Sequence, residues 1–309
     1  MTKPPKTILS SNFSDVAVPE LALPPGMISE AERRFLYHLA AKLHTGAGAL
    51  VEIGTWLGCS TLHLAAGLRD RGSVQQVHSY DDYQWRPGMA AKSGLDLAEG
   101  TSFYPNFLDN LGPLRPHVAP SVASATDLQW QGGKIESLVI DAPKSWRSIR
   151  RVLSQLAPHF ISGKTRIALQ DYLHLPSYEL ALYVASVEAL TPEIVVLDGS
   201  TVVFRVTRAI PAAVLRDDFN YKTFDQARID ALWARIIAAL PESRRYLLQP
   251  AHAMTLWQLG YREAAEAEIA ALEVTKEMAQ FVERKASKKT DAHFSWMRSA
   301  VLARRAAQV

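Results

Sequence analysis

The stretch from residue 49 to residue 65, ALVEIGTWLGCSTLHLA, places an acid inside an apolar run and follows it with two glycines. The run predicts a strand, and the residues after the second glycine predict a helix. Glycine lets a main chain turn sharply and approach a ligand closely, and a helix N-terminus offers free N–H groups to an anion. The turn around Gly54 and Gly58 is therefore a candidate ligand cradle, and Glu52 is the unexplained charge beside it.

The spacing of these glycines argues against one familiar kind of cradle. A dinucleotide-binding turn requires G-x-G-x-x-G directly after the strand. Here Gly54 and Gly58 are four residues apart, and bulky Trp56 stands where the second glycine would be. A nicotinamide-dependent oxidoreductase is disfavoured for this reason.

Other acids follow later strand-like runs. HSYDDY contributes Asp81 and Asp82, SLVID ends at Asp141, and TRIALQD ends at Asp171. In open α/β sheets, ligands bind beyond the carboxyl ends of the strands. Asp141, at the end of a central run, is expected at such a binding edge.

The elements that would position these residues alternate along the chain. Strand-like runs ALVEIG, VQQVHSYD, HVAPS, SLVID and TRIALQD are separated by segments with helical periodicity, which predicts a parallel sheet covered on both faces. The run EIVVLDGSTVVFRVTR breaks the alternation, because Asp198-Gly199-Ser200 between two β-branched runs signals a hairpin. We predict an α/β fold with a doubly wound, mostly parallel seven-stranded sheet and a terminal antiparallel hairpin.

The chain divides into three predicted parts. Residues 1–27 are proline-rich and predict an extended arm, with a disordered tail as the alternative. Residues 28–210 form the sheet domain, and its first helix begins near Ser29, with Glu32 completing a capping box. Residues 211–309 predict a helical accessory or oligomerisation segment. Within it, LWQLGYREAAEAEIAAL is similar to one tetratricopeptide-type helical hairpin. The sequence has no second copy of this hairpin at the expected period, so a repeat array is not predicted.

The motif E-I-G-T-W-L-G-C-S resembles the first motif of class I S-adenosylmethionine-dependent methyltransferases, in the E-x-G-x-x-x-G-x-S form of the catechol-type and macrolide-sugar-type O-methyltransferases. The resemblance covers roughly residues 28–208. That family's Rossmann-like fold has five parallel strands followed by a terminal hairpin, which is the order predicted above. The resemblance implies S-adenosyl-L-methionine as the cofactor and methyl transfer as the activity.

The same resemblance assigns cofactor-binding residues. Glu52 would contact the amino-acid part of the cofactor or order the loop around it, and Gly54 and Gly58 would permit close approach. Ser60 would cap the following helix and reach the cofactor carboxylate. Asp81, or alternatively Asp82, would accept hydrogen bonds from the ribose hydroxyls. Ser121 would lie near the adenine, although relatives often have an acid there.

The candidate catalytic edge matches the family in part. The D-x-x-K spacing of the catechol-type branch gives Asp141 as a metal ligand and Lys144 as the base, and Asp171 matches a second metal-ligand aspartate. Two such carboxylates could hold Mg²⁺, which would lower the pKa of a substrate hydroxyl. Lys144 can act as a base only if its pKa falls well below about 10.4. A metal-free site with Lys144 or His174 as the base is the alternative.

Two residues at this edge depart from the family pattern, so the resemblance does not supply a third metal ligand. Tyr172 stands where the catechol-type enzymes have Asn, and Gln170 stands where sugar-type enzymes often have an acid. The helix beginning K-S-W-R-S-I-R-R carries Lys144, Arg147, Arg150 and Arg151, so an anionic substrate is one interpretation and surface ion pairs are the other.

The composition of the chain limits the classes of protein to which it could belong. In 309 residues the net charge is +3, which is too small an excess to indicate nucleic-acid binding. A single cysteine and the lack of a membrane-length apolar run predict a cytoplasmic protein without a membrane partner. The leading hypothesis is an O-methyltransferase of a sugar, glycosylated natural product or polyphenol, acting as a homo-oligomer such as a dimer. The alternative is a non-catalytic relative that works as a binding or interaction module through its C-terminal helices.

Overall fold

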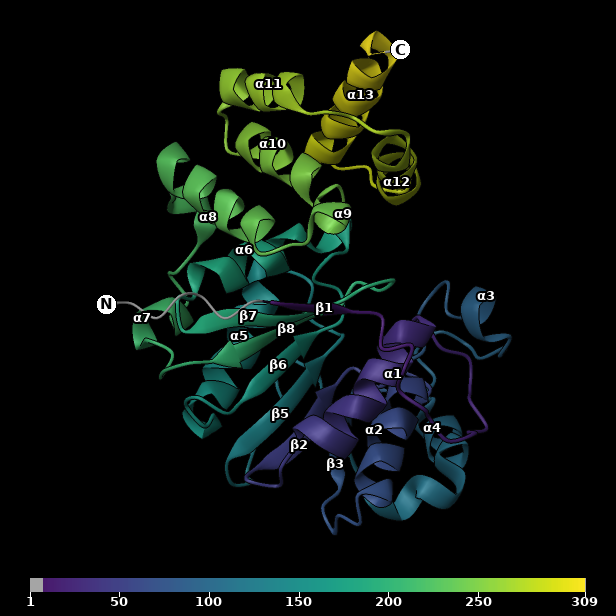
Figure 1. Cartoon of the computed structure of the whole chain (residues 1–309). Helices are drawn as coiled ribbons and strands as arrows, with labels where there is room; N and C mark the ends of the chain where they lie inside the picture. The colour runs from purple at the N-terminus through teal and green to yellow at the C-terminus, as the bar shows by residue number, and fades with distance from the viewer. Residues whose placement is uncertain (1–7, 309) are drawn as a thin grey trace.

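A single twisted sheet forms the centre of the molecule (Figure 1). The computed structural model describes residues 8–308, and its eight strands are arranged in the order β1-β7-β8-β6-β5-β2-β3-β4. The strands are β1 (Leu9–Ser11), β2 (Ala49–Ile53), β3 (Val77–Asp81), β4 (Val118–Val122), β5 (Ile135–Ile140), β6 (Arg166–Leu169), β7 (Leu190–Val196) and β8 (Val202–Val206).

The predicted terminal hairpin is confirmed. β7 and β8 pair antiparallel, and β8 also pairs antiparallel with β6, so that β8 lies between two strands of the opposite direction. Asp198, in the turn, has a φ of +62°. All other pairs in the described sheet are parallel.

The predicted strand number was one too low. Leu9–Ser11 of the N-terminal arm forms β1, which pairs in parallel with Ile194–Val196 of β7. The sequence of this arm has no apolar period that would indicate a strand, and its pairing depends on the exposed edge that β7 offers. Residues 1–7, the first part of the predicted arm, lie outside the described residues.

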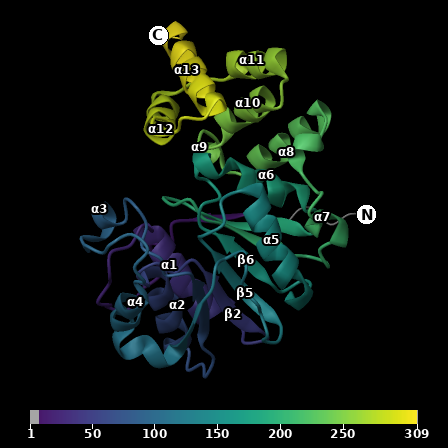
Figure 2. The ribbon, with the colours of Figure 1, turned by 180° about the vertical axis from the view of Figure 1, so that it is seen from behind.

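Helices cover both faces of the sheet (Figures 1 and 2). One face packs against α1, α2 and α4, and the other packs against α5 and α6. Side chains along a strand alternate between these two faces. Leu138 and Ile140 of β5 pack on the α5 and α6 side, and Val139 between them packs on the α1, α2 and α4 side. The helices of this part are α1 (Glu30–His38), α2 (Cys59–Asp70), α3 (Ala90–Ser93), α4 (Tyr104–Leu111), α5 (Trp146–Leu156), α6 (Tyr178–Ser186) and α7 (Ala212–Leu215).

Two helices begin at capping residues of the local sequence, and a third does not begin at the residue expected. Ser29 and Glu32 form the expected capping box at α1, and Ser145 caps α5 through the backbone N–H of Ser148. The expectation that Ser60 caps α2 was wrong. Gly58 is the N-cap in the left-handed conformation, without a side-chain cap, and Ser60 lies inside the first turn.

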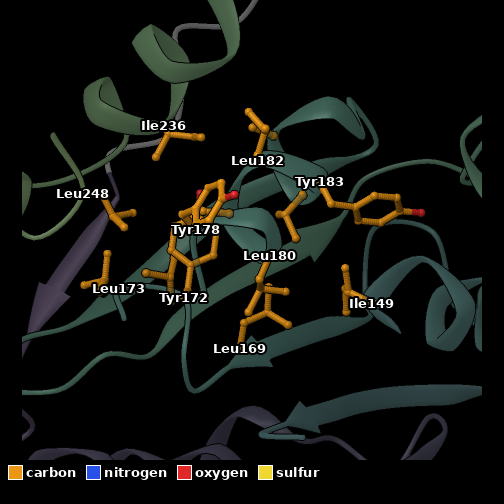
Figure 3. Packing of buried hydrophobic residues seen from close by; sticks show 14 of the residues in the cluster. Ile149, Leu169, Tyr172, Leu173, Tyr178, Leu180, Leu182, Tyr183, Ile236 and Leu248 are labelled. Carbon is orange, nitrogen blue, oxygen red and sulfur yellow. The ribbon is translucent and has the colours of Figure 1, made fainter. Parts of the chain in front are cut away.

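The remaining helices lie over α6 and continue its core. They are α8 (Gln226–Ala238), α9 (Glu242–Arg245), α10 (Gln249–Gln258), α11 (Arg262–Ala271), α12 (Lys276–Ala286) and α13 (Ala292–Ala307). Figure 3 shows Ile236 and Leu248 from this segment facing Tyr178 and Leu182 of α6, and all four belong to one apolar cluster. The helical hairpin expected in LWQLGYREAAEAEIAAL is formed by α10 and α11.

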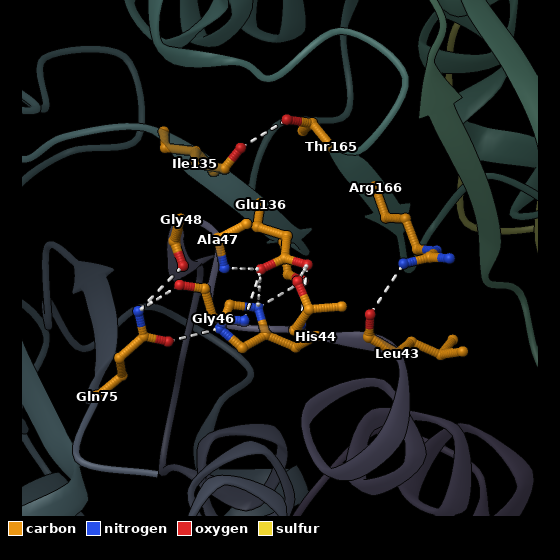
Figure 4. A network of polar contacts seen from close by, with 12 residues as sticks. Leu43, His44, Gly46, Ala47, Gly48, Gln75, Ile135, Glu136, Thr165 and Arg166 are labelled. Atoms are coloured by element: carbon orange, nitrogen blue, oxygen red, sulfur yellow. Dashed lines mark hydrogen bonds and ion pairs between the residues drawn. The ribbon is translucent and has the colours of Figure 1, made fainter.

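A polar network fastens the opposite, amino-terminal end of the central strands (Figure 4). The buried carboxylate of Glu136 accepts hydrogen bonds from the backbone N–H groups of Thr45, Gly46 and Ala47 at 2.8 Å and from the Thr45 hydroxyl at 2.7 Å. Burial acts against the charged form, but these bonds and nearby His44 hold the pKa of Glu136 below its usual value. This carboxylate therefore ties the loop before β2 to β5.

Within residues 8–308, no helix combines the length and apolar character needed to cross a membrane.

Candidate functional site

The turn after β2 passes against the turn after β5. Gly54 has a φ of +86°, and a Cβ at this position would lie 2.9 Å from the backbone nitrogen of Ala142. The backbone N–H of Asp141 donates to the carbonyl of Ile53 at 2.9 Å. β3 and β4 lie on one side of β2, and β5 and β6 lie on the other, so this is the switch point at which open α/β sheets bind ligands. Only glycine fits there without moving the neighbouring turn.

Glu52 lies beneath this turn and is fully buried. Its Oε2 accepts hydrogen bonds from the hydroxyls of Thr61 at 2.6 Å and Ser79 at 3.3 Å. Its Oε1 has no hydrogen-bond partner within the described part of the chain. Burial raises the pKa of Glu52 to about 7, although the hydroxyls of Ser60, Thr61 and Ser79 favour the charged form. In this structure, Glu52 orders the first turn of α2.

Asp81, the last residue of β3, also orders the turn. Its Oδ2 accepts from the backbone N–H groups of Thr55 at 2.9 Å and Trp56 at 3.0 Å, and its Oδ1 accepts from that of Tyr83 at 2.8 Å. Asp82 pairs instead with the guanidinium of Arg86 through both carboxylate oxygens. The two acids that the sequence left as alternatives thus have different partners.

A cavity of about 470 Å³ opens between the ends of β2, β3, β4 and β5, and we call it the glycine-turn cavity. Its volume is in the range of small-molecule sites. Of the predicted cofactor residues, Gly54, Asp81 and Asp82 line it, whereas Glu52, Gly58, Ser60 and Ser121 do not. Aromatic surface comes from Trp56, Tyr80 and Phe103, and the loop after β4 contributes Ser124, Ala125 and Thr126.

Three ionisable side chains meet at the ends of β5 and β6. The ammonium of Lys144 forms an ion pair with Asp171 Oδ2, and Asp141 lies beside both. Burial and the neighbouring Asp171 carboxylate raise the pKa of Asp141 well above its usual value. Burial alone would lower the pKa of Lys144, but the carboxylates of Asp171 and Asp141 outweigh it and raise that pKa. Lys144 is therefore a cation at neutral pH, which is the opposite of what a lysine base requires.

His174 lies next to this group and is neutral at pH 7. Its Nδ1 is 3.3 Å from the Ser177 hydroxyl and 3.9 Å from Asp171 Oδ1. Burial lowers the pKa of His174 to about 4, and the positive charges of Lys285 and Lys144 contribute, while Asp171 opposes the shift. A neutral imidazole can accept a proton.

A second cavity, of about 610 Å³, lies between the sheet and the C-terminal helices, and we call it the interdomain cavity. Asp171, His174 and Gln170 line it from the sheet side. Arg244 of α9 and Lys285 of α12 line it from the helical side. Met27, Asp141 and Lys144 line both cavities, so the two chambers meet at these side chains.

The donor set at this junction does not suit a magnesium ion as it stands. Mg²⁺ needs near-octahedral oxygen ligands, of which proteins usually supply one or two carboxylates. Asp141 and Asp171 provide two, but the ammonium of Lys144 already takes the cation's position at Asp171. Among residues 8–308, no three His, Cys, Asp or Glu side chains form a metal-binding group. The side-chain amide of Gln170 is buried beside them without a hydrogen-bond partner in that range.

The basic residues early in α5 are mostly engaged elsewhere. Arg150 is buried, donates to the carbonyl of Leu215 and pairs with Asp217. Arg151 pairs with Asp127. The ion-pair interpretation of this cluster therefore holds for Arg150 and Arg151, and of the four expected cations only Lys144 lines the glycine-turn cavity or the interdomain cavity.

Sequence reasoning missed the part of the site that the C-terminal helices contribute. Arg244, Arg284 and Lys285 line the interdomain cavity, yet they lie more than 70 positions beyond Asp171 in the chain. The one available signal was the excess of basic over acidic residues after residue 276, which predicts a charged surface without saying what it faces.

Comparison with known proteins agrees with this geometry. Residues 51–172 match the sequence family described as "Methyltransferase domain". The match spans the glycine turn, Asp141, Lys144 and Asp171, and with the sheet topology it confirms the resemblance to class I methyltransferases. Residues 51–172 thus match a methyltransferase domain, and β1 and the C-terminal helices lie outside the matched range.

Solved methyltransferase structures are similar to this chain at low sequence identity. The O-methyltransferase NovP is 18% identical, with a TM-score of 0.45 over 58% of this chain and 79% of that one. An O-methyltransferase from Bacillus cereus, solved in complex with SAH, is 16% identical, with a TM-score of 0.42 over 62% and 93%. CalS11, a TDP-rhamnose 3′-O-methyltransferase of calicheamicin biosynthesis, is 12% identical, with a TM-score of 0.39 over 56% and 76%. Among curated proteins, none matches this chain.

Proposed function

We propose that this protein is an S-adenosylmethionine-dependent methyltransferase that methylates a hydroxyl group of a small molecule. The observation that carries the proposal is the junction of two cavities at Asp141 and Lys144. One cavity lies at the switch point of a methyltransferase sheet, and the other is lined by ionisable groups. A methyl donor in the first chamber and an acceptor in the second would meet at that junction.

The residues of the glycine-turn cavity fit an adenosyl group. S-adenosylmethionine supplies an activated methyl group when it is bound. Trp56, Tyr80 and Phe103 offer aromatic surface to the base, and the buried Nε1 of Trp56 has no acceptor among the described residues. Asp81 Oδ1 accepts a single hydrogen bond in the described structure, and a carboxylate oxygen can accept two. We assign the ribose hydroxyls to Asp81, because Arg86 already engages both oxygens of Asp82.

In the interdomain cavity, His174 is the proposed base. Its Nδ1 faces Ser177 and Asp171, which leaves Nε2 for the acceptor hydroxyl. Nε2 would take the proton of the acceptor hydroxyl, so that the acceptor oxygen could receive the methyl group that bound S-adenosylmethionine would supply. Lys144, held by Asp171, positions the acceptor oxygen and stabilises the negative charge that develops on it.

Calorimetric titration of the full chain with S-adenosylmethionine, S-adenosylhomocysteine and NAD, each with and without Mg²⁺, tests the proposal. We expect both adenosyl compounds to bind with micromolar affinity, independently of Mg²⁺, and NAD to show no binding. Turnover of a hydroxylated acceptor panel should then persist in EDTA, because Lys144 supplies the positive charge at Asp171.

Three results would count against the proposal in different ways. Lack of S-adenosylmethionine binding would exclude the methyltransferase. Binding without transfer to any hydroxylated acceptor would favour the interaction module. Activity that disappears in EDTA and returns with Mg²⁺ would restore the metal site at Asp141 and Asp171 and would displace Lys144 from its role.

A further inference from the structure

Four cations of the interdomain cavity have no counterion in the described part of the chain. Lys92 comes from α3, Arg244 from α9, and Arg284 and Lys285 from α12, and all four line the cavity. We call them the cation cluster. Among residues 8–308, no carboxylate lies within 4.0 Å of the charged nitrogens of any of them, whereas Lys144 nearby is paired with Asp171.

The cluster is brought together by the fold and not by a local sequence run. α12 packs against the short helical turn η4 (Leu175–Ser177), which directly follows His174, so its residues Arg284 and Lys285 face the catalytic edge. Figures 1 and 2 both place α3 and α12 on the same side of the molecule. Three separate elements thus place cations around one cavity.

The charges affect one another across the cavity. Burial lowers the pKa of Lys285, and the positive charges of Arg284, Lys144 and Lys92 lower it further, against the opposing effect of Asp171. Arg244 and Lys285 are half-buried, whereas Lys92 and Arg284 are exposed. Like charges close to the half-buried side chains repel them. An anion bound among them would relieve that repulsion.

The acids that line the same cavity do not neutralise the cluster. Glu32 is buried and accepts hydrogen bonds from Ser29, Ser200 and Thr201. Asp171 is held by Lys144, and the raised pKa of Asp141 favours its neutral form. Asp198 is exposed at the rim and has no ion-pair partner within 4.0 Å in the described chain.

Arg244 offers the most directional contact. Its Nη2 donates to the carbonyl of Gly199, and its buried Nε has no acceptor among the described residues. Guanidinium groups bind carboxylate and phosphate oxygens through paired N–H donors, and a buried unpaired donor is costly. An acidic oxygen in the cavity would satisfy this nitrogen.

We infer that the acceptor carries an anionic group, a carboxylate or a phosphate, which the cation cluster binds while the acceptor's hydroxyl lies beside His174. This inference rests on the proposed function and adds the substrate class to it. The cluster places the anion on the C-terminal helices and the reacting hydroxyl on the sheet, so the two parts of the chain divide the recognition of one substrate between them.

The test uses matched acceptors that differ in one charge. Glucose 6-phosphate is compared with glucose, and 4-hydroxybenzoate with its methyl ester, by calorimetric titration of the full chain with and without saturating S-adenosylhomocysteine. We expect the anionic member of at least one pair to bind at least ten-fold more tightly than its neutral partner. The phosphate pair and the carboxylate pair distinguish the two kinds of anion.

Variants locate the effect. The double variant Arg284→Ala/Lys285→Ala should bind the anion at least ten-fold more weakly. Arg244→Lys should weaken binding by less, because lysine keeps the positive charge but lacks the paired N–H donors of the guanidinium group. Lys276→Ala, at the exposed start of the same helix and outside the cavity, is the matched control and should bind as the wild type does. Thermal melts of each variant show whether it is folded. Arg244→Lys is a conservative change that keeps the charge, so it still tests the inference if the double variant does not fold.

Two outcomes overturn the inference. One is equal affinity for charged and neutral members of both pairs, and the other is a preference for anions that the double variant leaves unchanged. A chain that fails to bind S-adenosylhomocysteine contradicts the proposed function instead, and the titration without it still decides whether the cation cluster binds anions.

Discussion

Lys144 and His174 line the same cavity but have opposite protonation states at neutral pH. The carboxylates around Lys144 keep it charged, whereas burial and neighbouring cations keep His174 neutral. The D-x-x-K spacing shows where Lys144 lies but not its ionisation, because the ionisation depends on Asp171 from the next strand. Residue chemistry at this site is thus set by contacts that only the folded chain makes.

Replacing His174 by Gln should lower kcat by about 100-fold with little change in S-adenosylhomocysteine affinity, because a positioned base typically contributes at least this factor. Steady-state kinetics on an accepted substrate measure it. In the wild type, kcat should be level near neutral pH and should fall as the pH drops through the pKa of His174, about 4. A normal rate in His174→Gln combined with an inactive Lys144→Gln would assign the base to Lys144 instead.

Glu136 gives a second prediction at this scale, away from the site. Its pKa is lower in the folded chain than the usual 4.5, so its stabilising contribution is complete above that pH and is lost as the pH falls through the folded pKa. Glu136→Gln should cost about 2 kcal/mol of unfolding free energy at pH 7, in line with hydrogen bonds to a charged group. Urea denaturation at pH 7 and at pH 4 should show the gap to the wild type narrowing at the lower pH. A gap that stays constant would contradict the account.

Among the elements, those with a local signature were predictable. The capping box of α1, the hairpin at Asp198 and the alternation of strands and helices each depend on neighbouring residues, and all three are confirmed. The strand β1 was not predictable, since it forms by pairing with β7, some 185 positions away. The interdomain cavity was not predictable either, because α12 lines it only through tertiary packing.

The turn between β2 and α2 is the element on which the glycine-turn cavity depends. Gly54→Ala should destabilise the protein by more than the roughly 1–2 kcal/mol of a left-handed residue, because its Cβ would also lie 2.9 Å from the Ala142 nitrogen. S-adenosylhomocysteine affinity should fall by at least ten-fold as the two turns separate. Gly72→Ala is the matched control, since Gly72 also has a positive φ but nothing lies within 4 Å of its added Cβ. Equal effects of the two substitutions on stability and binding would contradict the role of Gly54.

In the whole molecule, the sheet and the C-terminal helices share one core and one cavity. Tyr178 of α6 donates a hydrogen bond to Gln258 of α10 at 2.7 Å, and Trp146 of α5 donates to the carbonyl of Phe219 at 2.7 Å. The boundary predicted at residues 210 and 211 therefore separates two kinds of sequence, while the packing continues across it. The helices line the interdomain cavity, and self-association through them stays a prediction.

The central claim is that donor and acceptor chambers meet at Asp141 and Lys144. The most direct test is a crystal structure of the full chain with S-adenosylhomocysteine. We expect the adenosyl group in the glycine-turn cavity, its ribose hydroxyls on Asp81, and its sulfur at the junction facing His174 across the interdomain cavity. S-adenosylhomocysteine bound elsewhere, or with its sulfur turned away from Asp141 and Lys144, would contradict it.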